Sequence, residues 1–173
     1  KSKGDIACVQ VFNIRNGINL GNKSYYPDLP EPIEPSKILT AFLGQYYITH
    51  TIPEEIIASH KADDIELLQE MLCNKAGKKI SIIFTPRSKR ARWLEIAKKN
   101  VASALQGKLA SKTKFMQQFN ALQEELDLDF IPTRIECFDI SHTSGEATVA
   151  SCVVFEQEGP LKNNYRRFNI KDV

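Results

Sequence analysis

The sequence has few of the features that mark specialised classes of protein. Its four cysteines, Cys8, Cys73, Cys137 and Cys152, form no CxxC pair, and no cysteine–histidine cluster has zinc-binding spacing. We therefore expect free thiols, the usual state in a cytosolic protein. No apolar run approaches the ~20 residues that a membrane span requires, and no signal-peptide pattern opens the chain. These absences argue against a zinc module and a membrane protein, and they favour a cytoplasmic location.

An initiator methionine is also missing. The chain begins at Lys1 and stops at Val173, just after a strand-like run. We expect both ends to lie inside a longer protein.

Net positive charge is confined to one window of the sequence. Residues 87–114 carry nine basic residues and one acidic residue, whereas residues 1–86 and residues 115–173 each carry a net negative charge. Concentrated positive charge binds phosphate backbones. A solvated helix face would contain the same residues, so charge alone leaves both interpretations open.

Residues 1–86 alternate between strand and helix patterns. The Asn16-Gly17 pair predicts a tight turn between two strands, and four prolines between residues 27 and 35 predict a loop. Ser36 is a suitable N-cap for the first helix; Asp63 or Asp64 suits the second, which Gly77 should end. The expected elements are strands over 6–14 and 18–26, a helix over 37–47, a strand over 53–58, a helix ending at 76, and a strand over 79–85 buried on both faces.

From Ser88 onward the apolar residues follow a helical period. A stripe of Leu94, Ala97, Val101, Ala104, Leu105 and Leu109 predicts one helix that Gly107 breaks or bends, and Phe115, Phe119, Leu122 and Leu126 predict a second. After Pro132 the pattern returns to strands over 134–140, 147–156 and 164–170, joined by short turns. Three such strands predict an antiparallel meander.

The most specific pattern lies between residues 134 and 171, which contain FDISH, VASCVVF and YRRFNI in that order. This segment resembles the opening of the carboxy-terminal nuclease domain of the UvrC family, the excision-repair subunits that cut DNA beside a lesion. The upstream runs PRSKRARWLEIAKKNVASAL and IACVQVFNIRNG also resemble this family. The resemblance thus covers essentially the whole chain.

The resemblance implies an α/β fold built from RNase H-like mixed sheets with helices. We expect three regions: an RNase H-like domain over 1–86, a basic helical linker over 87–130, and the first three strands of an RNase H-like endonuclease domain over 131–173. The second RNase H-like unit is then incomplete, and its other catalytic residues should lie beyond Val173.

Asp139 is the candidate catalytic and metal-binding residue. It lies between Phe138 and Ile140 in an expected central strand, where a carboxylate is costly unless it is paired, hydrogen-bonded or bound to a cation. A structural ion pair is the alternative interpretation. The resemblance implies a ligand of Mg²⁺ or Mn²⁺ at this position, because RNase H-like nucleases place their first metal-binding aspartate here. The nearby His142 is interpreted first as a turn residue.

The candidate DNA-binding residues come from the basic window and from the last strand. Arg166 and Arg167 are adjacent on a strand and therefore point to opposite faces, so at most one of them faces the active site directly. The full set is Arg87, Lys89, Arg90, Arg92, Lys98, Lys99, Arg166 and Arg167.

Carboxylates are absent where the first unit would need one. No Asp or Glu occurs between Ile6 and Tyr26, and the first strand carries Val9, Gln10 and Val11 in the region where an active domain holds its aspartate. If residues 1–86 form an RNase H-like unit, we expect it to be catalytically inactive.

The resemblance implies that the intact protein hydrolyses a DNA phosphodiester on the 5′ side of a lesion in nucleotide excision repair. Its partners would be damaged double-stranded DNA and UvrB, the latter through a helical segment absent here; the GIY-YIG domain that makes the other cut is absent as well. The 173-residue chain alone should be inactive. Two alternatives remain: a non-catalytic DNA-binding module, and a structural connector of a repair protein.

Overall fold

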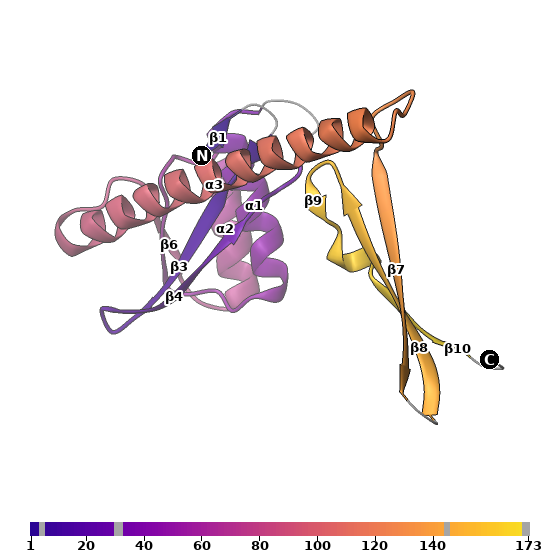
Figure 1. The fold of residues 1–173 in the computed structure, drawn as a ribbon. Coiled ribbons are helices and arrows are strands. Elements are labelled where there is room, and N and C mark those ends of the chain that lie inside the picture. The colour runs from indigo at the N-terminus through magenta and orange to yellow at the C-terminus, as the bar shows by residue number, and fades with distance from the viewer. Residues whose placement is uncertain (4–5, 30–32, 144–145, 171–173) are drawn as a thin grey trace. The chain divides into compact units, whose positions relative to one another are not determined.

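A computed structural model of the chain describes residues 1–3, 6–29, 33–143 and 146–170, with the side chains at 142, 143, 146 and 147 left aside (Figure 1). The chain divides into two compact units, Lys1–Gly107 and Lys108–Val173. The described residues form three α-helices and several small sheets, a mixed α/β architecture. Within the described ranges, no helix combines the length and the hydropathy of a membrane-spanning segment.

The first unit opens with a short antiparallel pair, β1 (Ser2–Lys3) and β2 (Ile6–Ala7), followed by the hairpin of β3 (Val9–Arg15) and β4 (Ile18–Tyr25). Asn16 and Gly17 join β3 to β4 with φ values of 51° and 74°, the left-handed geometry that a two-residue hairpin turn requires. The predicted turn is therefore confirmed. The register shifts between Phe12 and Ile14, so the hairpin is locally irregular there.

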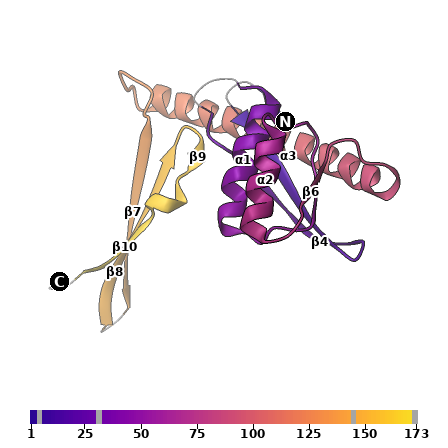
Figure 2. The ribbon, with the colours of Figure 1, turned by 180° about the vertical axis from the view of Figure 1, so that it is seen from behind.

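Two helices and a parallel strand pair complete the sheet-and-helix part of this unit. They are α1 (Pro35–Thr49), β5 (Glu55–Ile57), α2 (Ile65–Ala76) and β6 (Ser81–Ile83). Figure 2 shows α1 and α2 side by side. Leu72 and Ile80 are fully buried in the apolar cluster that these elements share, which extends from Leu43 to Ile82.

The helix ends agree only partly with the sequence prediction. Ser36 is not the N-cap of α1; Glu34 is, because Pro35 occupies the first turn, where its fixed φ suits a helix and its missing N–H costs nothing. Asp64 does stand at the N-cap of α2, but in a left-handed conformation (φ 50°) without a side-chain capping hydrogen bond. Gly77 ends α2 with φ 63°, as predicted.

The prediction that residues 79–85 are buried on both faces is wrong. Ile80 and Ile82 are buried, whereas Ser81 between them is exposed. β6 therefore presents one face to the core, as the two-residue period of a strand dictates.

α3 (Ser88–Glu125) is one continuous helix of 38 residues that crosses the boundary between the units. The predicted break at Gly107 is wrong. A Cβ at Gly107 would meet nothing within 4 Å, and a helix tolerates one interior glycine at a cost of about 1 kcal/mol.

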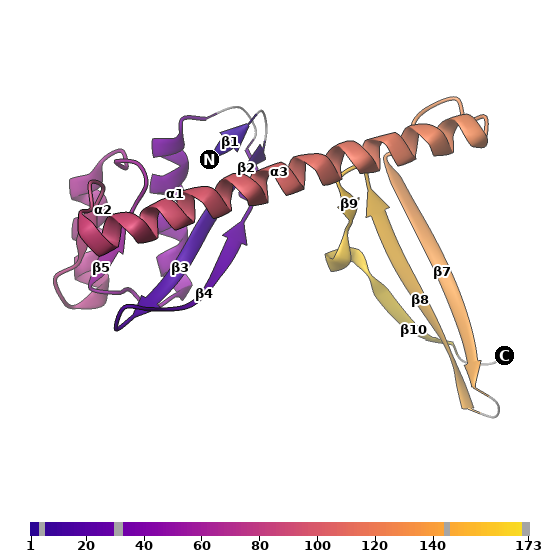
Figure 3. The same cartoon turned by 60° about the vertical axis from the view of Figure 1, so that its left-hand side comes forward.

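The second unit is built on β7 (Arg134–Thr143), β8 (Glu146–Glu156) and β10 (Arg166–Ile170), with β9 (Gly159–Pro160) pairing to β8 (Figure 3). A 3₁₀ turn, η1 (Lys162–Asn164), precedes β10. The strand order is β10-β8-β7 and both pairings are antiparallel, which agrees with the expected meander. Within this sheet β8 is central and β7 is an edge strand, so the expected central position of the Asp139 strand is not found among the described residues.

The C-terminal part of α3 packs against the β8–β9 turn. Gly159 has a φ of 115°, and a Cβ built on it would lie 2.7 Å from the ring of Phe115. Lys112 forms an ion pair with Glu158 at 3.1 Å. Glycine is therefore required at residue 159 for two reasons, its backbone conformation and the aromatic ring against it.

All four cysteines are free, as the sequence predicts.

Candidate functional site

Asp139 lies in the second half of β7, opposite Ser151 on β8. Its side chain is exposed, so the prediction of a carboxylate enclosed by apolar neighbours is wrong. The reason is geometric: Phe138 and Ile140 point to the opposite face of the sheet, and no further strand lies beside β7 among the described residues. An exposed carboxylate stays charged without an ion pair or a bound cation, so the cost of burial favours neither interpretation of Asp139.

Strand register places one arginine on the face that carries Asp139. Arg167 on β10 lies opposite Ser151, and Ser151 lies opposite Asp139. Directly opposed residues of an antiparallel sheet project to the same side. Asp139, Ser151 and Arg167 therefore form one row across three strands, with the small Ser151 between the two charged residues.

The other arginine belongs to the opposite face. Arg166 lies in register with Cys152, which in turn lies opposite Phe138. Its guanidinium donates hydrogen bonds to the carbonyl oxygens of Asn163 and Tyr165, each at 2.9 Å. The expectation that the two arginines point to opposite faces is thus confirmed, and Arg166 is engaged in fixing the turn before β10.

The described residues do not by themselves form a metal site. Among them, no group of three or more His, Cys, Asp or Glu side chains is placed to hold a metal ion. Asp139 offers oxygen ligands of the kind that Mg²⁺ and Mn²⁺ prefer, but no group of three ligands includes it among those residues. His142 lies in β7, and its side chain is outside the described part of the structure.

The basic window divides into engaged and outward-facing residues. Arg90 donates to a carboxylate oxygen of Glu55 at 2.6 Å, and this hydrogen bond raises the pKa of the Arg90 guanidinium above its ordinary value. Lys98 pairs with Glu95 at 2.9 Å. Arg87 precedes the first residue of α3 and is therefore outside the helix.

Lys89, Arg92 and Lys99 form the outward-facing part of the window. All three are exposed, and spacings of three and seven residues place them on one side of α3. Leu94, Ala97 and Val101 on the other side line a cavity of the first unit. We call Lys89, Arg92 and Lys99 the basic face of α3.

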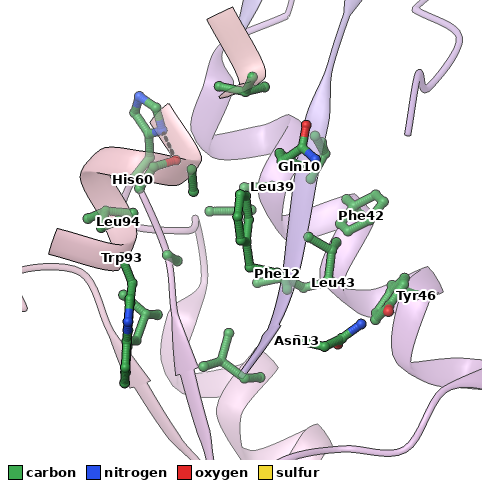
Figure 4. A pocket seen from close by; sticks show the side chains of 18 of the residues that line it. Gln10, Phe12, Asn13, Leu39, Phe42, Leu43, Tyr46, His60, Trp93 and Leu94 are labelled. Atoms are coloured by element: carbon green, nitrogen blue, oxygen red, sulfur yellow. Dashed lines mark hydrogen bonds between the residues drawn. The ribbon is translucent and has the colours of Figure 1, made fainter. Parts of the chain in front are cut away.

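The cavity of the first unit has a volume of about 830 Å³ and lies between β3, α1, the β5 segment and α3 (Figure 4). Its lining includes every residue from Cys8 to Ile14 and from Pro53 to His60. Successive residues of a strand point to opposite faces, so residues from both faces of β3 and of β5 line the cavity. The cavity therefore runs along the unpaired edges of these two strands. Among the described residues, β3–β4 and β5–β6 are separate ladders, the first antiparallel and the second parallel.

Sequence reasoning missed this cavity and the role of Ser151 in the row. The cavity lies along the unpaired edges of β3 and β5. No local sequence pattern predicts it, because its position depends on which strands do not pair. Counting back from the β7–β8 turn would pair Asp139 with Ala150, because the register shifts between Ser141 and Thr143. The row is therefore visible only in the structure.

Comparison with known proteins supplies the family. Residues 1–108 match the UvrC Ribonuclease H-like domain, and residues 123–173 match the UvrC RNAse H endonuclease domain. The protein named UvrABC system protein C from Alkalilimnicola ehrlichii is 46% identical over 172 residues, which cover 99% of this chain and 28% of that protein. The proteins of the same name from Nitrosococcus oceani and Methylococcus capsulatus are 46% and 43% identical over 97% and 99% of this chain, again 28% of each relative.

The chain therefore spans little more than a quarter of the length of these curated relatives. The two domain matches fall in succession along the chain, and together they leave only residues 109–122, within α3, outside a matched domain. On these matches, the chain belongs to the UvrC family.

Proposed function

We propose that this chain is part of the nuclease subunit of an excision-repair system, which hydrolyses a DNA phosphodiester on the 5′ side of a lesion. The observation that carries the proposal is the exposed carboxylate of Asp139 on a three-stranded meander, within the residues that match a UvrC RNAse H endonuclease domain. The substrate would be damaged double-stranded DNA, and UvrB would be the protein partner, through a segment outside this chain.

Asp139 would be one ligand of a divalent cation, Mg²⁺ or Mn²⁺, whose chemistry is to activate water and stabilise the leaving oxygen. One carboxylate cannot hold a pair of metal ions, so the remaining ligands must come from other parts of the subunit. The 173-residue chain alone is therefore inactive in this proposal. The division of labour would be an RNase H-like unit without catalytic carboxylates over 1–86, a basic helical linker over 87–130, and the start of the endonuclease domain over 131–173.

DNA would lie along the basic face of α3. The outward direction of Lys89, Arg92 and Lys99 supports this, because these ammonium and guanidinium groups are exposed and accessible to phosphates. Arg90 and Lys98 contribute less, since each already has a carboxylate partner.

The test is Asp139→Asn in the full-length subunit, assayed on a duplex with one defined lesion. Incision on the 5′ side should fall by about 10³-fold or more, because removal of a metal ligand forfeits several kcal/mol of transition-state stabilisation. Incision at the wild-type rate would leave the DNA-binding module as the better interpretation. A subunit that neither incises nor shows salt-dependent DNA binding would support the structural connector.

A further inference from the structure

The face of the second unit that carries Asp139 has a charged residue at each end of one row. Asp139 and Arg167 are separated by a single strand, with Ser151 between them. Neighbouring strands lie about 4.8 Å apart, so the two backbones are roughly 10 Å apart. A carboxylate and a guanidinium at this separation can both reach one small group lying above the middle strand.

Ser151 keeps the middle of the row open. Its neighbours on the same face of β8 are Val149 and Val153, which are larger and apolar. The row through Ser151 is thus where a polar ligand meets both the least steric hindrance and a hydroxyl group.

The side chain of Arg167 has no structural duty within the described residues. It is exposed, and no hydrogen bond or ion pair there involves it. Arg166 differs in its bonding, since its guanidinium is bonded to two backbone carbonyls on the opposite face. Adjacent arginines of equal charge therefore have separate roles.

We infer that Arg167 binds the scissile phosphate of the DNA above Ser151, beside Asp139, and stabilises the negative charge that develops there. This inference rests on the proposed function and adds a substrate-contacting residue to it. A guanidinium suits the role because its planar fork donates two parallel hydrogen bonds to phosphate oxygens and stays charged at every physiological pH. Arg166 takes no part in substrate binding.

The experiment uses full-length subunits carrying Arg167→Ala, Arg167→Lys, Arg166→Ala or Asp139→Asn. Single-turnover incision should fall by about 10²-fold or more in Arg167→Ala, the usual loss for one transition-state donor, and only partly recover in Arg167→Lys. Arg166→Ala should incise at the wild-type rate once its thermal melt shows a folded protein. Arg167→Gln, which keeps a long polar side chain, replaces Arg167→Ala if the latter does not fold.

A second readout does not depend on the metal. In EDTA, Arg167→Ala should lower the log–log salt slope of DNA binding by about 0.9, whereas Arg166→Ala should leave it unchanged. On DNA with a neutral methylphosphonate at the incision position, wild-type and Arg167→Ala subunits should bind equally, because the charge that Arg167 contacts is gone.

The outcomes separate the inference from the proposed function. The assignment of Arg167 is overturned if Asp139→Asn is inactive while Arg167→Ala incises within about threefold of the wild-type rate. A threefold difference corresponds to less than about 0.7 kcal/mol of transition-state stabilisation. An affinity difference that persists on methylphosphonate DNA would also overturn it, since Arg167 would then contact another phosphate. Wild-type incision by Asp139→Asn would instead remove the proposed function itself.

Discussion

The two long hairpins of the chain, β3–β4 and β7–β8, place different chemistry at the same distance from their turns. Arg15↔Ile18 closes the first ladder and Thr143↔Glu146 closes the second. The register shifts between Phe12 and Ile14 in the first ladder and between Ser141 and Thr143 in the second. Four residues before the closing pair, β3 carries Val11, whereas β7 carries Asp139.

The partners across the ladder differ in the same way. Val11 lies opposite Lys23, whose ammonium group stands 5.1 Å from the centre of the Tyr25 ring, whereas Asp139 lies opposite Ser151. Where the second hairpin has the carboxylate of Asp139 and the small Ser151, the first hairpin has Val11 and Lys23, and Lys23 lies over an aromatic ring. A shared hairpin geometry does not carry function; the residue at one register position does.

The units also differ in how they bury apolar surface. The first holds a cluster around the fully buried Leu72 and Ile80. The second buries the small or medium residues of β8 but leaves Phe138 and Ile140 59% and 57% exposed on the same face of the sheet. The first unit therefore has a hydrophobic core of its own, whereas one apolar face of the sheet in the second unit remains partly exposed.

The largest expected effect comes from moving the carboxylate between the hairpins. In the full-length subunit, Val11→Asp combined with Asp139→Asn should stay about 10³-fold or more below the wild-type incision rate, because β3 lacks an open neighbour and further ligands. Val11→Asn alone should not change incision, since the proposed chemistry uses no side chain of β3. Recovery of incision by the double variant would show that the two hairpins are interchangeable.

The core comparison can be tested with two identical substitutions on one helix. Leu72→Ala should destabilise the first unit by about 2–5 kcal/mol, because it leaves a cavity at a fully buried position. Leu67→Ala, also on α2 but 68% exposed, should change stability by no more than about 0.5 kcal/mol. Urea denaturation of the chain measures both. Equal effects would mean that the cluster is not the stabilising core.

A glycine exchange probes the second unit in the same way. Gly159→Ala should cost about 2–3 kcal/mol, because φ 115° strains a residue with a Cβ and the Phe115 ring stands in its way. Gly107→Ala within α3 is the control and should stabilise by about 0.5–1 kcal/mol. Phe115→Ala in the Gly159→Ala background should restore part of the stability. If it restores nothing, the ring contact is not the source of the cost.

Local signals predict the parts of this fold that are local. The Asn16-Gly17 turn and the Gly77 helix end follow from backbone preferences of single residues, and both are found. The FDISH motif assigns Asp139 to the correct strand, but the expected burial of its side chain is wrong. Burial of Asp139 depends on which strands lie beside β7, and the sequence of β7 does not specify its neighbours.

Non-local features are the ones that sequence does not supply. The break expected at Gly107 does not occur, since the penalty of a single glycine is small against the packing of a long helix. The gap along the open edges of β3 and β5 has no sequence signature. The choice between Arg166 and Arg167 depends on the register of β7, β8 and β10. The sequence does not give this register, because it shifts between Ser141 and Thr143 and because β9 and η1 lie between β8 and β10.

The smallest effects are expected on the affinity for duplex DNA. Here the effect of reversing the charges of the basic face of α3 is compared with the effect of reversing three other basic residues of the first unit. Replacing Lys89, Arg92 and Lys99 by Glu in the full-length subunit should weaken duplex binding, and it should lower the log–log salt slope by about 0.9 for each phosphate that the variant no longer neutralises. The control is a triple reversal of equal charge, Lys75→Glu, Lys78→Glu and Lys79→Glu, near the C-terminal end of α2. Anisotropy titrations over a range of salt concentrations measure both.

Single substitutions then separate an outward cation from an engaged one. Arg92→Ala should lower the slope by about 0.9, because its exposed guanidinium is available to a phosphate. Arg90→Ala should change the slope little, since Glu55 already holds that guanidinium at 2.6 Å and would have to release it to DNA. Equal slopes for both variants and wild type, together with full low-salt affinity in the basic-face triple variant, would mean that the charge only solvates the helix. In that case the functional difference between the two units would depend only on Asp139, Ser151 and Arg167.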